Sequence, residues 1–345
     1  MIRLFGYELK KILSITALWI FVGLCVVFNM WNIPFGSTVE VDTTTPFAIN
    51  VFEYYNTSEV AEKYIYELNL TGRVATRMRA KYDDLQVRVD EKTIAGYSFS
   101  PYLGKYTFFM HLNVFGNSGV MGRLLFQGIL IAVLLALLGI GYEQINNTGH
   151  SIYATKIGRR ILRYKVAASL VTGIGIYILL AIITLATYFT VFNFSNVWGS
   201  SISSGFNYIS DIFISRPFAT WHSFTVRSYL LASLGVSLGL IICFSLMGVI
   251  IGTFSKNGYI GFLIAVLVNA VCIILPAFFS INSYTHYVLH HTPIWLWWNS
   301  GLWFTDGGFI TLWRNFELWG TGVSLLIFTA ICILAVKKFE KRDIV

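Results

Sequence analysis

Charge is scarce in this sequence. Only 12% of its 345 residues are Asp, Glu, Lys or Arg, about half the share of an average soluble domain. The mean hydropathy of +0.66 and the hydrophobic content of 56% exceed what a globular core needs. These values exclude a disordered chain and argue against a soluble enzyme. The sequence therefore predicts an integral membrane protein.

Two chemical signatures are also missing. The four cysteines (Cys25, Cys243, Cys272 and Cys332) all lie in apolar runs, which argues against a disulfide framework or a cysteine-based metal site. The sequence lacks the Gly-x-x-x-x-Gly-Lys-Ser/Thr loop that binds nucleotide phosphates, because no glycine stands at the required offset before the single Gly-Lys pair. We therefore expect no catalytic, cofactor or metal residues on this chain, and no ATP hydrolysis by it.

Six segments are apolar and long enough to cross a membrane, which requires about 20 residues of helix. They are 12–31, 124–142, 166–192, 228–254, 258–281 and 318–336. None contains Asp, Glu, Lys, Arg or His, the residues that ion-coupled carriers normally place in their spans. The first run is too long for a signal peptide and lacks a cleavage site, so we interpret it as a retained span.

Smaller features of the spans predict how they pack. Span four contains two Gly-x-x-x-Gly motifs, at 235–239 and 248–252, and such motifs permit close helix approach. Asn29 and Asn269 are the strongest polar groups in the spans, and we expect them to form hydrogen bonds between helices. Pro276 is expected to kink span five or to end its regular part.

Basic residues are distributed unequally between the connecting segments. The start of the chain, the loops after spans two and four, and the tail hold 13 Lys and Arg, whereas the two short loops on the other side hold three. Because cytoplasmic loops are enriched in Lys and Arg, both termini are predicted to be cytoplasmic. We expect an all-α, multi-pass protein of the cell membrane, with residues 1–345 forming a single transmembrane domain.

Residues 1–11 predict an amphipathic helix. Apolar Ile2, Phe5 and Leu9 lead at helical spacing into the first span, and charged residues lie between them. A helix of this kind lies in the plane of the membrane interface. The alternative is that these residues are only the flank of the span.

The first outer segment, 32–123, is the one part of the chain with the composition to fold in water. Its middle, 59–89, predicts a helix, because Ser58 resembles a cap and apolar residues recur at helical spacing with a shift near Gly72. We expect a helical hairpin or a long broken helix packed on the membrane mouth. A small independent domain is the alternative, although few Leu and Ile would give it a thin core.

The last outer segment, 282–317, is rich in tryptophan, and we expect short outer helices here between spans five and six. The candidates for its outer surface are Trp295, Trp297, Trp298 and Trp303. Tryptophan favours the membrane–water interface, so these residues form an aromatic belt or, alternatively, line an exit for an amphiphilic substrate. His286 and His290 are four residues apart, but no third metal ligand follows at a recognisable spacing.

The segment 143–165 is longer than a connection between antiparallel spans requires. Glu143 closes span two, a Thr-Gly turn follows, and a basic amphipathic helix leads into span three. We expect Glu143 to orient this loop by pairing with one of the arginines at positions 159, 160 and 163. The residues expected to face a soluble partner are Thr148, Ser151, Ile152, Tyr153, Lys156, Arg159 and Arg160.

This segment resembles that of the permease subunits of type-2 ATP-binding-cassette (ABC) exporters. The resemblance rests on the acidic residue, the Thr-Gly turn, the Ser/Thr-bearing helix and the Lys-x-Gly-Arg-Arg run, and it extends to the topology of the whole chain. It implies that 143–165 is a coupling helix seated on an ATPase subunit. His150, Ile152 and the long first outer segment depart from the family pattern, and the long segment leaves the substrate class open.

The resemblance also implies partners and a function. We expect two ATPase subunits that hold ATP and Mg, a second permease copy or a paralogue, and surrounding lipids of a bacterial plasma membrane, but no nucleic acid. The substrate would be hydrophobic or amphipathic, with a membrane-active or antimicrobial peptide as the favoured class, in export or in immunity. Co-purification of an ABC ATPase would distinguish this function from the two alternatives below.

Two other functions remain open on sequence. One is a membrane enzyme that acts on a lipid-linked substrate at the outer interface, through His286, His290, His291, Asp306 or Glu317. The other is a receptor that does not transport and whose first outer segment binds a peptide.

Overall fold

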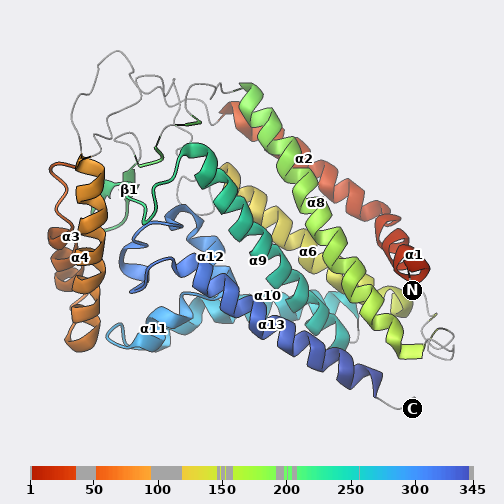
Figure 1. The fold of residues 1–345 in the computed structure, drawn as a ribbon. Helices are drawn as coiled ribbons and strands as arrows, with labels where there is room; N and C mark the ends of the chain where they lie inside the picture. Colours follow the sequence, from red (N-terminus) through yellow and green to blue (C-terminus); the bar gives the residue numbers. More distant parts are fainter. Residues whose placement is uncertain are drawn as a thin grey trace.

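The fold is a bundle of six long apolar helices with a polar cap at one end (Figure 1). The computed structural model describes residues 2–35, 52–94, 119–145, 148, 152, 158–191, 198–199, 201–203, 208–255 and 257–341. The six helices are α2 (Thr16–Phe35), α6 (Val120–Ile145), α8 (Ile161–Val191), α9 (Val226–Phe254), α10 (Gly258–Ile274) and α13 (Phe316–Glu340). Each is long and apolar enough to cross a membrane, α10 together with the turn that extends it to Phe278, so the chain is a multi-pass membrane protein, as predicted.

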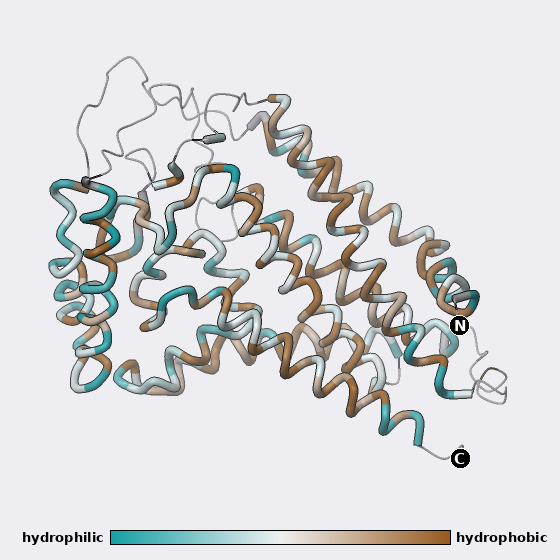
Figure 2. Tube along the Cα trace, viewed as in Figure 1, coloured by the Kyte–Doolittle hydropathy of each residue, from teal (hydrophilic) through white to brown (hydrophobic). Residues whose placement is uncertain are grey.

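Both termini lie at one end of the bundle, which we call the basic end (Figure 1). At the other end lies the cap, by which we mean helices α3 (Thr57–Glu67) and α4 (Gly72–Ile94) together with residues 208–221 and 275–315. Hydrophobic residues dominate the long helices, whereas α3, α4 and the helix ends beside the C-terminus are hydrophilic (Figure 2).

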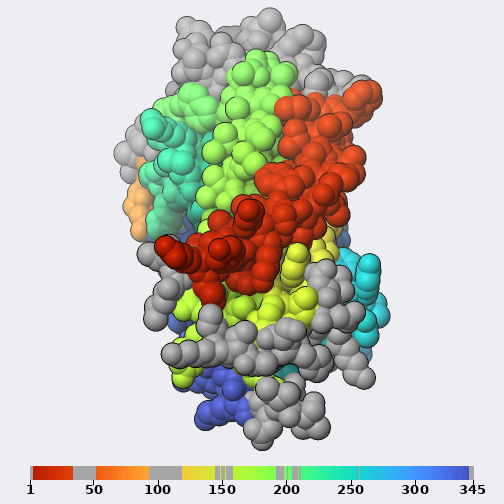
Figure 3. All heavy atoms as spheres, turned by 90° about the vertical axis from the view of Figure 1, so that its right-hand side faces the viewer, coloured from red at the N-terminus to blue at the C-terminus, as the bar shows by residue number. Residues whose placement is uncertain are grey.

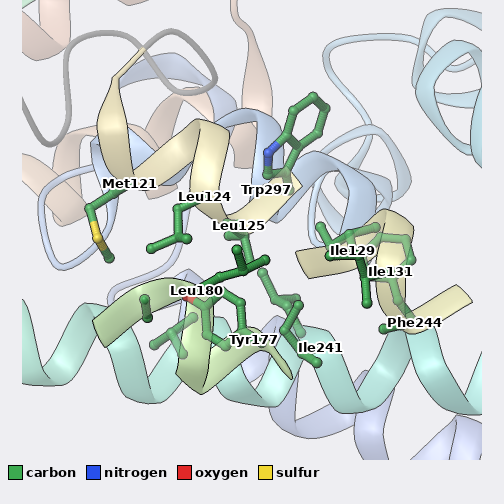
Figure 4. Packing of buried hydrophobic residues seen from close by; sticks show 14 of the residues in the cluster. Met121, Leu124, Leu125, Ile129, Ile131, Tyr177, Leu180, Ile241, Phe244 and Trp297 are labelled. Atoms are coloured by element: carbon green, nitrogen blue, oxygen red, sulfur yellow. The ribbon is translucent and has the colours of Figure 1, made fainter. Parts of the chain in front are cut away.

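Helices α6 and α9 form the centre of the bundle. In α6, 78% of the span is buried, compared with 17% in α10. α6 packs against α8 and α9, while α13 covers another side of α9 and α2 lies along α8. Figure 4 shows Leu124 and Leu125 of α6 meeting Tyr177 and Leu180 of α8 and Ile241 of α9.

Small residues allow α9 to approach its neighbours. A Cβ atom added at Gly248 would lie 2.8 Å from Cβ of Ala136 on α6, and one at Gly239 would lie 2.6 Å from Cγ2 of Thr321 on α13. Neither position has room for a larger side chain. The expected close packing is therefore confirmed at both glycines, but Gly235 has no neighbouring atom within 4 Å.

The amphipathic helix at the start of the chain is confirmed as α1 (Ile2–Leu13). It lies across the surface of the bundle, packed mainly on α8 (Figure 3). The chain turns directly after it, where the Ser14 hydroxyl donates to the Lys11 carbonyl at 2.8 Å. The first long helix therefore begins at Thr16 and not at the predicted position 12.

Polar groups join three of the long helices. The Asn29 amide on α2 donates to Oε1 of Gln127 on α6 at 2.8 Å and to Oγ1 of Thr184 on α8 at 3.0 Å, and Gln127 donates back to Asn29 Oδ1 at 2.9 Å. The prediction for Asn29 is confirmed. Asn269 donates both to the carbonyl of Ala265 in its own helix, at 2.8 Å, and to Sδ of Met247 on α9, at 3.8 Å.

The predicted helical hairpin in the first outer segment is confirmed as α3 and α4. The cap of α3 is Asn56 and not Ser58, because the Asn56 side chain accepts a hydrogen bond from the Ser58 main-chain N–H at 3.0 Å. The break between the helices contains two left-handed residues, Asn69 at φ 50° and Gly72 at φ 57°. Such angles favour Asn and Gly.

The remaining cap segments are short. The expected outer helices are α11 (Tyr284–Leu289) and α12 (Pro293–Trp298), which follow a single turn that contains Pro276 and ends the regular part of span five. An antiparallel hairpin of β1 (Tyr208–Ser210) and β2 (Ser215–Pro217), with Ile209 opposite Arg216, was not predicted.

Candidate functional site

Four charged side chains meet at the basic end of the bundle. Lys11 Nζ on α1 lies 2.6 Å from Oε1 of Glu8 and 3.1 Å from Oε1 of Glu143, the acidic residue that closes the apolar part of α6. Lys165 near the start of α8 pairs with the other carboxylate oxygen of Glu143. We call Glu8, Lys11, Glu143 and Lys165 the basic-end network. It connects three helices at the point where the predicted coupling loop leaves the bundle.

Most of the basic-end network is buried. Glu143 is 1% exposed and Lys165 is 2% exposed. The Lys165 ammonium also donates to the main-chain carbonyls of Gly139 and Ile140, at 3.2 Å each, so that α8 is tied to the last turns of α6. Removing one partner of a buried ion pair typically costs about 3–5 kcal/mol, because the other charge stays unpaired. The network is thus a rigid link between α6 and α8.

The prediction that Glu143 pairs with an arginine of the loop is wrong. Arg163 pairs instead with Glu340 at the end of α13, with Nη2 and Oε2 2.6 Å apart. Residues 163 and 165 are about 200° apart around a helix, so they face opposite sides of α8. Lys165 therefore faces α6 and pairs with Glu143, the residue that was predicted to pair with an arginine.

The other residues of the predicted coupling loop have varied positions. Thr148 and Arg160 are exposed, and Ile152 is half-buried, with its N–H donating to the Thr148 carbonyl at 3.1 Å. Arg159 donates to the Phe339 carbonyl on α13 at 3.4 Å. The residues of this set that lie outside the described part of the chain are Ser151, Tyr153 and Lys156.

A second buried cluster of charge joins the segments of the cap. Arg216 on β2 donates from Nε to Oδ2 of Asp306 at 3.0 Å and from Nη1 to Oδ2 of Asp211 at 2.7 Å. Tyr82 on α4 donates to Asp306 at 2.5 Å, and Tyr64 on α3 donates to Asp211. We call these five residues the cap network. All three segments of the cap meet in it.

Asp306 is ionised despite its burial. Burial raises the pKa of this carboxyl, but the charges of Arg216 and Lys81 and the hydrogen bond from Tyr82 outweigh that effect and hold its pKa below the usual value. Lys81 Nζ in turn donates to the carbonyls of Asp306, Gly308 and Thr311, at 3.2, 2.6 and 2.9 Å. One carbonyl is thus available for each of its three hydrogens.

The helical hairpin shares its apolar core with the rest of the cap. Tyr64, Met78 and Leu85 are each fully buried, in one cluster with Trp221 and Leu312 from the other two segments. The hairpin is therefore part of the cap, and the alternative of a small independent domain is not what the structure shows.

Only one of the four tryptophans expected on the outer surface is exposed. Trp298 is 47% exposed, whereas Trp297 and Trp303 are buried and Trp295 is half-buried. The three covered rings each donate their indole N–H to a main-chain carbonyl at 3.1 Å, those of Gly122, Leu296 and Cys272 for Trp297, Trp303 and Trp295 respectively. Trp297 and Trp295 thus hold α12 on α6 and α10, whereas Trp303 holds the following turn on α12.

The ring nitrogens of the cap histidines form hydrogen bonds with main-chain and side-chain groups of the cap. Nδ1 of His290 lies 2.8 Å from the His286 carbonyl oxygen, and Nε2 of His291 lies 3.1 Å from Oγ1 of Thr311. Burial lowers the pKa of His290 and of His291 to about 4, so both are neutral at pH 7. Among the described residues, no three His, Cys, Asp or Glu side chains lie close enough together to hold a metal ion.

The acidic residues proposed for an outer enzyme are also covered. Asp306 is 2% exposed beneath Lys81, Tyr82 and Arg216. Glu317 is fully buried in the first turn of α13, so the last helix carries a carboxylate that the predicted span 318–336 left out. Neither presents an acid or base to an outside substrate, and the geometry does not favour the enzyme alternative.

Comparisons with protein families, with curated proteins and with solved structures find no match for this chain.

Proposed function

We propose that this chain is the membrane-spanning subunit of an ABC exporter of the type-2 class, powered by a separate ATPase subunit. The observation that carries the proposal is the basic-end network. It places Glu143 and Lys165, which bracket the predicted coupling loop, in direct contact with each other and with α1. A loop whose two ends are fixed in this way can pass a push from a soluble partner to the bundle.

Because the basic-end network is buried, a force applied to the predicted coupling loop would move the helices and not merely bend the loop. An ion pair that has lost its water keeps its geometry, because separating the charges leaves each one buried and unpaired. Motion of the loop would therefore shift the end of α6 and the start of α8 together. α6 is the most buried of the long helices, so its displacement reaches the whole bundle.

The outer faces of the bundle support assembly with a second copy. α2 and α10 are only 28% and 17% buried, and both expose apolar side chains, such as Ile20 and Leu263. The family resemblance implies that these two spans meet their counterparts in a dimer. Between the copies, an apolar lining suits a hydrophobic or amphipathic substrate, and a membrane-active peptide is the class that we favour.

The test of this function is to purify the full chain from its own membrane and to identify what accompanies it. We expect an ATPase with a nucleotide-binding phosphate loop, whose hydrolysis in lipid nanodiscs rises with substrate. Absence of such an ATPase under conditions that keep the permease folded would overturn the proposal.

Glu143→Gln tests the mechanism in the same assay. It should keep the ATPase bound, since Glu143 faces the bundle, and should abolish the stimulation of hydrolysis. The matched control is Arg163→Gln, which breaks the exposed pair with Glu340 and should leave the stimulation unchanged. Normal stimulation in a folded Glu143→Gln variant would remove the coupling role of the network.

A further inference from the structure

A groove of about 770 Å³ opens between α2 and α6 and ends against α12. Its walls are apolar, with Leu24 and Phe28 on one side and Phe126 on the other, and Trp297 closes the end that faces the cap. The volume lies within the range of small-molecule sites, about 300–1,000 Å³. Arg123 is the single charged residue among those that line it.

Arg123 lies near the end of a helix long enough to cross a membrane, where lipid head groups are expected. It is in the first turn of α6, at the cap end. Next to it, the Trp297 indole donates to the Gly122 carbonyl at 3.1 Å, and its ring stacks on Phe126 with centroids 5.0 Å apart. Arg and Trp side chains at the end of a membrane helix are typical of the interface between hydrocarbon and water.

The guanidinium has no acidic partner within the described part of the chain, although it is half-buried. Gln127, the other polar residue of the groove, exchanges hydrogen bonds with Asn29 at 2.8 and 2.9 Å, so its amide is already used. Arg123 is therefore the side chain of the groove that is available to bind a polar group of a ligand. A partly desolvated cation of this kind favours an anionic partner, because a charge-assisted hydrogen bond offsets its lost hydration.

We propose that the groove binds an anionic phospholipid of the surrounding membrane, with the phosphate on Arg123 and an acyl chain along α2 and α6. The apolar walls by themselves do not select a ligand, since lipid tails outside the groove are equally apolar. Arg can donate to two phosphate oxygens at once in any phospholipid. Selectivity comes from the net charge of the head group, because a zwitterionic lipid carries its own ammonium, which neutralises the phosphate and repels Arg123.

Two other occupants fit the charge less well. A second copy of the chain seated by two-fold symmetry on this groove would bring the same surface to itself, so each Arg123 would still lack a counter-charge. A cationic membrane-active peptide would place like charge against Arg123. The anionic lipid is the occupant that satisfies both the walls and the cation.

The experiment is native mass spectrometry of the purified full chain, delipidated and then offered equal amounts of phosphatidylglycerol and phosphatidylcholine. We expect retention of phosphatidylglycerol over phosphatidylcholine by about tenfold, because only phosphatidylglycerol brings a net negative charge to Arg123. Arg123→Gln should bring the ratio close to one, and Arg123→Lys should keep part of the preference. The matched control is Arg227→Gln, an exposed arginine in the first turn of α9 at the same end of the bundle.

A second variant separates loss of binding from loss of folding. Val27→Trp fills the groove from an exposed position on α2 and leaves Arg123 in place, so it should reduce retention of both lipids while the thermal midpoint stays unchanged. Equal retention of the two lipids by the wild type, an unchanged ratio in Arg123→Gln, or a lipid-free dimer closed over the groove would each overturn the proposal. The assay contains no ATPase and reads lipid retention alone, so its failure is distinguishable from a failure of the proposed exporter function, which is read from ATPase co-purification and hydrolysis.

Discussion

Tyr82 donates its phenolic hydrogen to Oδ2 of Asp306 across 2.5 Å, and so joins two residues that are 224 positions apart. Tyr82 lies on α4, in the first outer segment, whereas Asp306 lies between the last two long helices. Arg216, from a third segment, holds the same carboxylate at 3.0 Å. One buried anion therefore fixes the relative positions of all parts of the cap.

Asp306→Asn should loosen the cap without dissolving the bundle. The substitution removes the carboxylate charge next to the buried Arg216 and Lys81. Breaking a buried ion pair in this way costs about 3–5 kcal/mol of stability. We expect the α3–α4 hairpin to become cleavable by a protease added to the purified protein, with cuts between residues 52 and 94. Glu62→Gln, in the exposed pair between Glu62 and Arg79 on the same two helices, should leave the cleavage pattern unchanged. Equal protection in both variants would show that apolar contacts alone hold the cap.

The cap should lose stability as the pH falls below neutrality. His290 and His291 have their pKa values lowered to about 4 by burial, against about 6.5 in an unfolded chain. Their contribution is complete above pH 6.5 and is lost between about 6.5 and 4, by at most about 1.4 kcal/mol per pH unit for each histidine.

The measurement is the denaturation midpoint by tryptophan fluorescence between pH 8 and 3. Replacing His290 or His291 by Gln should flatten this dependence by about half in each case. Below pH 4 a further loss should appear in all variants, because Asp306, whose pKa is held below its usual value, then takes up a proton. The same pH dependence in the wild type and in both histidine variants would contradict the assignment of buried neutral histidines.

Two glycines of α9 should respond in opposite ways to an added side chain. Gly248→Val forces atoms into the contact with Ala136, where even a Cβ would lie at 2.8 Å, and overpacking of this kind costs about 1–3 kcal/mol. Gly235→Ala meets open space and removes a flexible residue from a helix, so it should stabilise by about 0.5–1 kcal/mol. Thermal unfolding of both variants in one detergent makes the comparison. A similar loss at both positions would mean that backbone flexibility, and not contact, requires glycine in this helix.

The orientation in the membrane is predicted from charge and can be tested with single cysteines. In a chain whose four native cysteines are replaced by Ala, Lys63→Cys on α3 should react with a membrane-impermeant thiol reagent applied to intact cells. Lys337→Cys, near the end of α13, should react only after the cells are opened. Both positions are exposed, so access to water does not distinguish them. The reverse pattern would place the basic end outside the cell.

The sequence was sufficient to predict the long helices and the helical hairpin of the cap. Apolar runs of this length form membrane helices whatever their neighbours are. The hydrocarbon core accommodates their side chains, and the helix itself makes the backbone hydrogen bonds. The periodicity of residues 59–89 likewise predicted α3 and α4, since the buried face of a helix repeats along the local sequence. Sequence signals were less reliable at the ends of helices. For α3 the sequence predicted Ser58 as the N-cap, and the structure shows Asn56.

Only the tertiary structure decided which charges meet. Arg123, Glu143, Lys165 and Glu317 all flank the predicted apolar runs, and the sequence alone does not determine which group each of them contacts. The helices extend past those runs, and packing then buries Glu143 against Lys11, a residue 132 positions away. No local pattern encodes such a pair, because it depends on the angle at which each helix presents its ends. Hydrophobicity therefore determined how the chain crosses the membrane, while the packing of helix ends determined where its buried charges lie.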